Sequence, residues 1–193
     1  QKALMIPPGL AFLAVSPRAW RQIESVPDRP TFYFDLLAYR KSLATPDTPY
    51  TPAIPLIVSL AESLRLIRAA GIEQVWARAR QLSAAARAGL EALGLRLVAK
   101  RPAEGLTAAH LPEGVDGKAF LGRLESRFGV KLANGQGQLK GKTFRLAHMG
   151  VLDELDILSA LAAIELTLLE LGAPVELGRG VAAAGRLLAE APT

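Results

Sequence analysis

The chain opens with the segment QKALMIPPG, residues 1–9, and continues with the apolar run LAFLAV, residues 10–15. The two prolines and the glycine impose a turn between the two apolar stretches. The run 10–15 is short, continuous and bounded by turn residues, so it predicts a buried strand. Lys2 stands just before the turn, and a lysine taken alone is most often a solvated surface charge. A lysine amine can also condense reversibly with an aldehyde, which is the chemistry of covalent cofactor binding.

Outward from this segment, the next part of the chain reads as helices joined by loops. Ser16 and Pro17 suit the N-cap and first turn of a helix that we expect to end at Val26. The aromatic-rich stretch 31–35 predicts a packing cluster. Residues 45–55 hold four prolines and predict a rigid loop. Two longer helices are then expected, because apolar residues recur at helical spacing and a glycine follows each run; they cover 56–71 and 73–93.

After Gly94 the pattern changes to short strands alternating with helices. Four strands are predicted: 95–99, 106–111, 130–133 and 143–150. Asp116 is the expected N-cap of a helix that ends near Phe128, and Asp153 with Asp156 caps a last long helix. Residues 178–190 are rich in glycine and alanine, so either a terminal helix or a partly frayed end is open.

Two features of the C-terminal half bear on chemistry. The glycine-rich segment 134–142 fits neither the Walker nor the dinucleotide-binding pattern, so a flexible loop is favoured over a phosphate-binding loop. Arg145 lies inside a predicted strand, where its guanidinium could bind a carboxylate through two parallel donors or could form a structural ion pair. His148 lies three residues further on, hence on the opposite strand face, and we interpret it and His110 as structural.

The composition excludes several classes of site. The 193 residues include no cysteine, so disulfides, thiolate metal sites and cysteine nucleophiles are absent from this portion, which also fits a cytoplasmic location. We predict no metal site. The net charge of +5 invites a nucleic-acid partner, but the arginines are scattered and aromatics make up only 6%. No uncharged apolar run reaches 18 residues, so no membrane-spanning helix is predicted.

The opening motif has a family resemblance. Gln-Lys, the apolar segment, Pro-Pro-Gly and the small apolar strand resemble the cofactor-lysine segment of class V pyridoxal-phosphate (PLP) aminotransferases, in the branch of the alanine/serine–glyoxylate enzymes. The Gly-Gln-Gly, Lys-Gly-Lys, Phe-Arg-Leu and Met-Gly elements within 135–150 resemble the second signature of that family. The resemblance implies that Lys2 binds PLP covalently and is catalytic, and that Arg145 binds the α-carboxylate of the substrate. It implies that Tyr50 and Thr51 reach the cofactor phosphate of a neighbouring subunit.

The same resemblance implies an architecture. The fold class would be α/β: the C-terminal part of a PLP-transferase fold-type I large domain, followed by an α+β small domain. Residues 1–94 would end the PLP-binding large domain with a long connecting helix, and residues 95–193 would form the small domain. The family's N-terminal half carries the phosphate loop, the ring-stacking aromatic and the aspartate that pairs with the pyridine nitrogen, so this portion alone is expected to be inactive. A homodimer with shared active sites is also implied.

The implied activity is transamination between a small amino acid, alanine or serine, and a 2-oxo acid such as glyoxylate or pyruvate. Another class V enzyme, such as an aspartate aminotransferase, remains an alternative. A cysteine desulfurase would need a sulfur-accepting cysteine, which this portion lacks. A non-catalytic helical interaction domain that only resembles the family is the alternative from a different class, and bound PLP would distinguish it from an enzyme.

Overall fold

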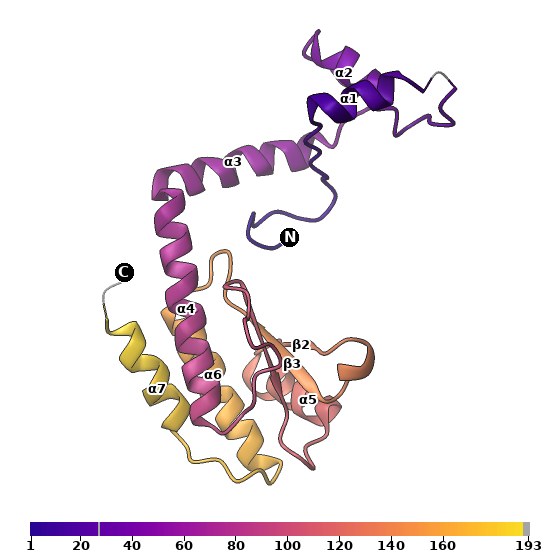
Figure 1. Ribbon diagram of the computed structural model, residues 1–193. Helices are drawn as coiled ribbons and strands as arrows, with labels where there is room; N and C mark the ends of the chain where they lie inside the picture. Colours follow the sequence, from indigo (N-terminus) through magenta and orange to yellow (C-terminus); the bar gives the residue numbers. More distant parts are fainter. Residues whose placement is uncertain (27, 191–193) are drawn as a thin grey trace. The chain divides into compact units, whose positions relative to one another are not determined.

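The computed structural model describes residues 1–26 and 28–190, coloured along the chain in Figure 1. The chain forms two compact units. The first unit comprises Gln1 and Ile6–Leu64, and the second comprises Lys2–Met5 and the chain from Arg65 onward. The predicted domain boundary between residues 94 and 95 stays a prediction.

The first unit contains α1 (Pro17–Glu24), α2 (Leu36–Leu43) and the start of α3 (Ile54–Ala70). The α1 prediction is confirmed, because the Ser16 side chain accepts a hydrogen bond from the Ala19 N–H at 3.2 Å and Pro17 occupies the first turn. The sequence analysis missed α2, whose N-cap is Asp35.

The predicted strand at residues 10–15 is wrong. No regular structure forms there, and Phe12 and Leu13 are 65% and 70% exposed. A strand requires a hydrogen-bonded neighbour, and no strand of the described residues pairs with this run. The run is apolar enough for a strand, but it has no partner in this part of the chain.

The long helices agree with their predicted ranges to within two residues. α3 begins at Ile54 rather than at residue 56, so Pro55 lies in the first turn, where its missing N–H leaves no hydrogen bond unmade. Gly71, with φ 86°, separates α3 from α4 (Ile72–Ala92). The proline-rich loop is therefore shorter than the sequence suggested.

In the second unit, helices pack on one another and on one face of a small sheet. The sheet is antiparallel, in the order β1-β3-β2, with β1 Leu106–His110, β3 Thr143–Ala147 and β2 Ala133–Asn134. α5 (Gly117–Phe128) contacts β2, β3 and α6 (Glu154–Glu170), while α4 packs against α6 and α7 (Arg179–Leu188). The largest fully buried apolar side chains of this core are Phe120, Phe144, Leu82, Leu90, Leu124, Ile157, Leu161, Ile164 and Leu168.

The strand register determines which side chains of the sheet point into the core and which point away from it. Ala109 pairs with Phe144, and both are fully buried, so their sheet face packs on the helices. Ala108 pairs with Arg145 one residue along, and the alternation of side chains puts this pair on the other face. Arg145 therefore lies on the sheet face that points away from the core.

The predicted strands are shorter in the structure. Residues 95–99 form a single bridge, Leu97 to Ala109, flanked by Val98 N–H to Ala108 O and His110 N–H to Arg96 O, both at 2.9 Å. The strand predicted at 130–133 is reduced to β2, and the one predicted at 143–150 ends at Ala147.

The last two helices, α6 and α7, agree with the sequence predictions. Asp153 and Asp156 form the predicted capping box at the start of α6. Residues 179–188 form the helix α7, so the helical alternative for the C-terminal segment is confirmed. Within the described residues, no helix is long and apolar enough to cross a bilayer.

Candidate functional site

Lys2 lies in an exposed turn of the second unit. The Met5 N–H donates to the Lys2 carbonyl at 3.0 Å, and Met5 adopts φ 55°, which is unusual for a residue with a side chain. The Lys2 side chain is exposed and has no hydrogen bond or ion pair among the described residues. Its amine is therefore open to bind a ligand.

The Lys2 turn lies against the segment that follows β3. A Cβ atom added to Gly150 would lie 3.3 Å from the Met5 Cγ atom and 3.6 Å from the Lys2 carbonyl oxygen. Gly150 also has φ 81°, so a side chain there would be strained. This glycine lets the two backbones approach each other, and it lies five residues after Arg145.

Arg145 is half-buried on β3, between Ala108 of β1 and Ala133 of β2. Its Nε–H donates to the Asn134 carbonyl at 2.8 Å, which orients the guanidinium plane. In the described part of the chain, the two terminal nitrogens make no hydrogen bond or ion pair. A planar group held at one edge and open at the other can bind a carboxylate with two parallel donors.

His148 lies three residues after Arg145 and is buried, which fits its interpretation as a structural residue. Its Nδ1 lies 2.7 Å from the Glu104 carbonyl and its Nε2 lies 2.8 Å from the Thr107 hydroxyl. A carbonyl can only accept, so Nδ1 carries the proton and Nε2 accepts from Thr107. Burial lowers the pKa of His148, which keeps the ring neutral. The histidine is thus a structural group that anchors the chain between Arg145 and Gly150.

Sequence reasoning missed the group of hydrogen-bonded polar residues around this histidine. The Glu104 carboxylate accepts from the Ser83 hydroxyl of α4 and from the Arg87 guanidinium, the latter at 3.3 Å. Ser83 and Thr107 are fully buried. A serine in the middle of an amphipathic helix was the available signal, because a buried hydroxyl requires a hydrogen-bond partner.

Tyr50 and Thr51 belong to the first unit, whereas Lys2 and Arg145 belong to the second. The Tyr50 hydroxyl donates to the Phe32 carbonyl at 2.8 Å, and its ring lies 4.8 Å from the Tyr33 ring and 5.5 Å from the Phe32 ring. The predicted aromatic packing is present, but Phe32 remains 80% exposed. Thr51 is exposed three residues before the start of α3.

The glycine-rich segment 134–142 folds back on itself. It contains the short 3₁₀-helix η1 (Gly137–Leu139), and the Asn134 side chain accepts from the Gly141 N–H at 2.9 Å. The Gly135 N–H donates to the Thr143 carbonyl at 3.0 Å. These bonds hold the segment as a hydrogen-bonded loop, so the predicted loop is present. The preference against a phosphate-binding role stays a prediction.

Comparison with known proteins adds independent information. The family model Aminotransferase class-V matches residues 1–147. An uncharacterized aminotransferase of Methanocaldococcus jannaschii is 44% identical over 179 residues, which cover 91% of this chain and 46% of that protein. An L-aspartate–glyoxylate aminotransferase of Paracoccus denitrificans is 37% identical, covering 95% of this chain and 47% of its own length.

A solved structure shares the fold. Ureidoglycine–glyoxylate aminotransferase from Bacillus subtilis superposes with a TM-score of 0.89 at 29% identity, covering 98% of this chain and 50% of its own. The chain thus spans about half the length of the relatives that it matches. The mixed helix-and-sheet architecture predicted from the sequence is confirmed as the C-terminal portion of this fold.

Proposed function

This chain belongs to the class-V aminotransferase family, and we propose on that basis that it is part of a PLP-dependent aminotransferase. The observation that carries the proposal is the contact between the Lys2 turn and Gly150, which follows the strand of Arg145. An open amine and an open guanidinium on neighbouring segments are the two groups that such a reaction needs from this part of the protein.

The residues present fit the cofactor. The Lys2 amine is exposed and has no partner among the described residues, so it would hold PLP covalently and, once released, carry the proton of the substrate α-carbon. The Arg145 guanidinium would bind the α-carboxylate and orient the α-proton toward Lys2. PLP itself would supply the electron sink, while the protein supplies position and charge.

For the substrates, we propose a small amino donor and a 2-oxo acid acceptor. The proteins from Paracoccus and Bacillus both have glyoxylate in their names, which supports glyoxylate as acceptor, with pyruvate next. Alanine or serine is the proposed donor. Aspartate is the second candidate, because the Paracoccus relative is named for it.

We also propose a homodimer in which Tyr50 and Thr51 contact the cofactor phosphate of the other subunit. Thr51 precedes the N-terminus of α3, where an anion is favoured, and Phe32 and Phe34 expose 80% and 79% of their surface. Tyr50 would have to exchange its bond to Phe32 for one to the phosphate. A cytoplasmic location without a nucleic-acid partner fits the lack of cysteine and the scattered arginines.

The test uses the full-length protein. It should be yellow, and borohydride reduction followed by peptide mapping should find the cofactor on Lys2. An assay of alanine, serine and aspartate against glyoxylate and pyruvate then identifies the substrate pair. A protein without PLP absorbance would support the non-catalytic alternative, and a label on a different lysine would contradict the role of Lys2.

A further inference from the structure

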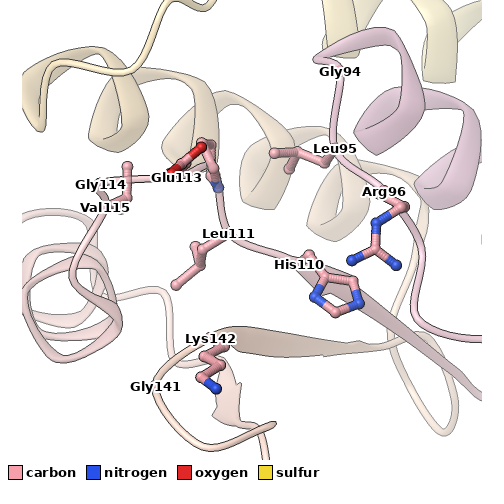
Figure 2. A pocket seen from close by; sticks show the side chains of 11 residues that line it. Gly94, Leu95, Arg96, His110, Leu111, Glu113, Gly114, Val115, Gly141 and Lys142 are labelled. Atoms are coloured by element: carbon pink, nitrogen blue, oxygen red, sulfur yellow. The ribbon is translucent and has the colours of Figure 1, made fainter.

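A cavity of about 570 Å³ opens at the His110 end of β1. Three segments of the second unit line it: residues 94–96, residues 110–115 and residues 141–142 (Figure 2). None of the four candidate site residues contributes to this lining. Transamination as proposed above requires nothing of this cavity.

Three nitrogen-bearing side chains surround the cavity: Arg96, His110 and Lys142. The bridge between Leu97 and Ala109, with the His110 N–H bonded to the Arg96 carbonyl at 2.9 Å, puts Arg96 directly opposite His110. Side chains of such a pair lie on one sheet face, with Cβ atoms about 5 Å apart. Figure 2 shows the guanidinium beside the imidazole ring, and Lys142 extending from the neighbouring segment. The Lys142 carbonyl accepts a hydrogen bond from the Leu111 N–H at 2.9 Å, which connects this segment to the end of β1.

Within the part of the chain that the structure describes, these three side chains have no polar partners. Among residues 1–26 and 28–190, none of their nitrogens makes a hydrogen bond or an ion pair. Glu113 is the carboxylate of the lining, and it forms no ion pair with another described residue either. Burial, and secondly the charge of Arg96, lower the pKa of His110. Like charges placed opposite each other on a sheet are destabilising, and a bound anion would reverse that effect.

We propose that this cavity binds a small oxyanion, a carboxylate or a phosphate group, held by Arg96, Lys142 and His110. The guanidinium offers a planar pair of donors, the imidazole offers a further N–H, and the ammonium on its long stem can follow the shape of the ligand. His110 ends β1 and donates its N–H to the Arg96 carbonyl beside the bridge, so two of the three donors stand on backbone that is held by hydrogen bonds.

The test follows the His110 ring in the full-length protein by NMR, with the resonance assigned from His110→Gln. Sulfate serves as the probe for a phosphate group and acetate as the probe for a carboxylate, with chloride at matched ionic strength as the control. A bound anion favours the protonated ring, so the pKa of His110 should rise in sulfate, in acetate or in both, compared with chloride. His148, buried and already bonded at both nitrogens, should not respond. Whether sulfate or acetate acts at lower concentration distinguishes the two ligand classes.

Variants then locate the site. Arg96→Gln and Lys142→Gln should each weaken anion binding by about tenfold or more, the size expected for losing a charge-assisted hydrogen bond. Arg186→Gln on α7 removes the same charge outside the cavity and should leave binding unchanged. Equal pKa shifts in all three salts, or equal effects of Arg96→Gln and Arg186→Gln, would overturn the proposal. Either result would leave the aminotransferase assignment intact, because that assignment rests on the label at Lys2.

Discussion

At the scale of single residues, the Arg145 guanidinium is oriented by a single hydrogen bond. One bond, from its Nε to the Asn134 carbonyl, orients the guanidinium and leaves both terminal nitrogens open. An α-carboxylate is common to every amino donor and oxo acid, so in the proposed transamination one fixed cation would serve both half-reactions. A rigid strand supplies that cation with little loss of side-chain freedom on binding.

We therefore expect Arg145→Ala in the full-length enzyme to keep bound PLP and its colour while losing about 3 kcal/mol of transition-state stabilisation, roughly a hundredfold in kcat/KM. Arg145→Lys should recover only part of this, because an ammonium lacks the planar pair of donors. Steady-state kinetics with Arg186→Ala as the control measures the effect. Unchanged efficiency in Arg145→Ala would mean that the arginine has only a structural role.

We expect His148 to make the free energy of unfolding depend on pH. Because burial lowers the pKa of His148, the unfolded chain takes up a proton near pH 6.5 while the folded chain does not. Its contribution to stability is therefore complete above about pH 6.5 and is lost as the pH falls toward the lowered folded pKa. We expect the denaturant midpoint of the full-length protein to fall over this range.

His148→Gln should flatten that pH dependence, because an amide can bond to Glu104 and Thr107 without titrating. His110→Gln is the matched control, since the pKa of His110 is lowered in the same direction at a far less buried site. If both variants keep the wild-type pH dependence, groups other than the two histidines control it.

At the scale of elements, α7 depends on a carboxylate from another helix. Glu165 of α6 is 3% exposed and accepts from the backbone N–H groups of Gly178, Gly180 and Val181 at 2.6, 2.8 and 3.1 Å. Free N–H groups at a helix start need acceptors, and a negative charge there also complements the helix dipole. Glu165 thus replaces the N-cap side chain that Gly178 lacks.

We expect Glu165→Ala to destabilise α7 by about 2–4 kcal/mol, because it leaves buried N–H donors unpaired. Glu165→Gln should cost less, since its amide oxygen still accepts. Hydrogen exchange across Arg179–Leu188 measures the change directly. Glu176→Ala, which breaks only the exposed 3.6 Å pair with Arg179, should have little effect. Equal protection in Glu165→Ala and Glu176→Ala would show that Glu165 is not the cap.

At the scale of the whole molecule, the proposed active site is shared between subunits. In this proposal, Lys2 would come from one subunit and Tyr50 with Thr51 from the other. Coexpression of a Lys2→Ala chain with a Tyr50→Phe/Thr51→Ala chain tests this arrangement. Hybrid dimers would contain one site with an intact lysine and an intact phosphate-binding pair, so activity should exceed that of either variant alone.

The control is the triple variant that carries all three changes in one chain, because its dimers can form no intact site. Sedimentation under assay conditions should show at least a dimer. Activity of the mixture equal to the average of its parents would mean that Tyr50 and Thr51 serve the cofactor of their own subunit, or none.

The sequence by itself determined the helices whose start or spacing is encoded by residues close together in the chain. Ser16-Pro17, Asp116 and the Asp153/Asp156 pair predicted helix starts that the structure confirms, because a cap bonds to backbone a few residues away. The same holds for the long helices between Ile54 and Ala92, which carry a helical apolar period. The opening motif and the segment around Arg145 also carried enough pattern to predict the family.

Tertiary structure alone decided what depends on distant partners. The apolar run 10–15 is not a strand because no neighbouring strand pairs with it, and residues 95–99 keep a single bridge at the sheet edge. The Glu165 carboxylate can be buried because it accepts hydrogen bonds from the N–H groups of Gly178 and Gly180, thirteen and fifteen residues away. The cavity between Arg96, His110 and Lys142 exists because strand register brings three separate segments to one end of the sheet. A strand needs a hydrogen-bonded partner that lies far away in the sequence, so an apolar run by itself does not show whether a strand will form.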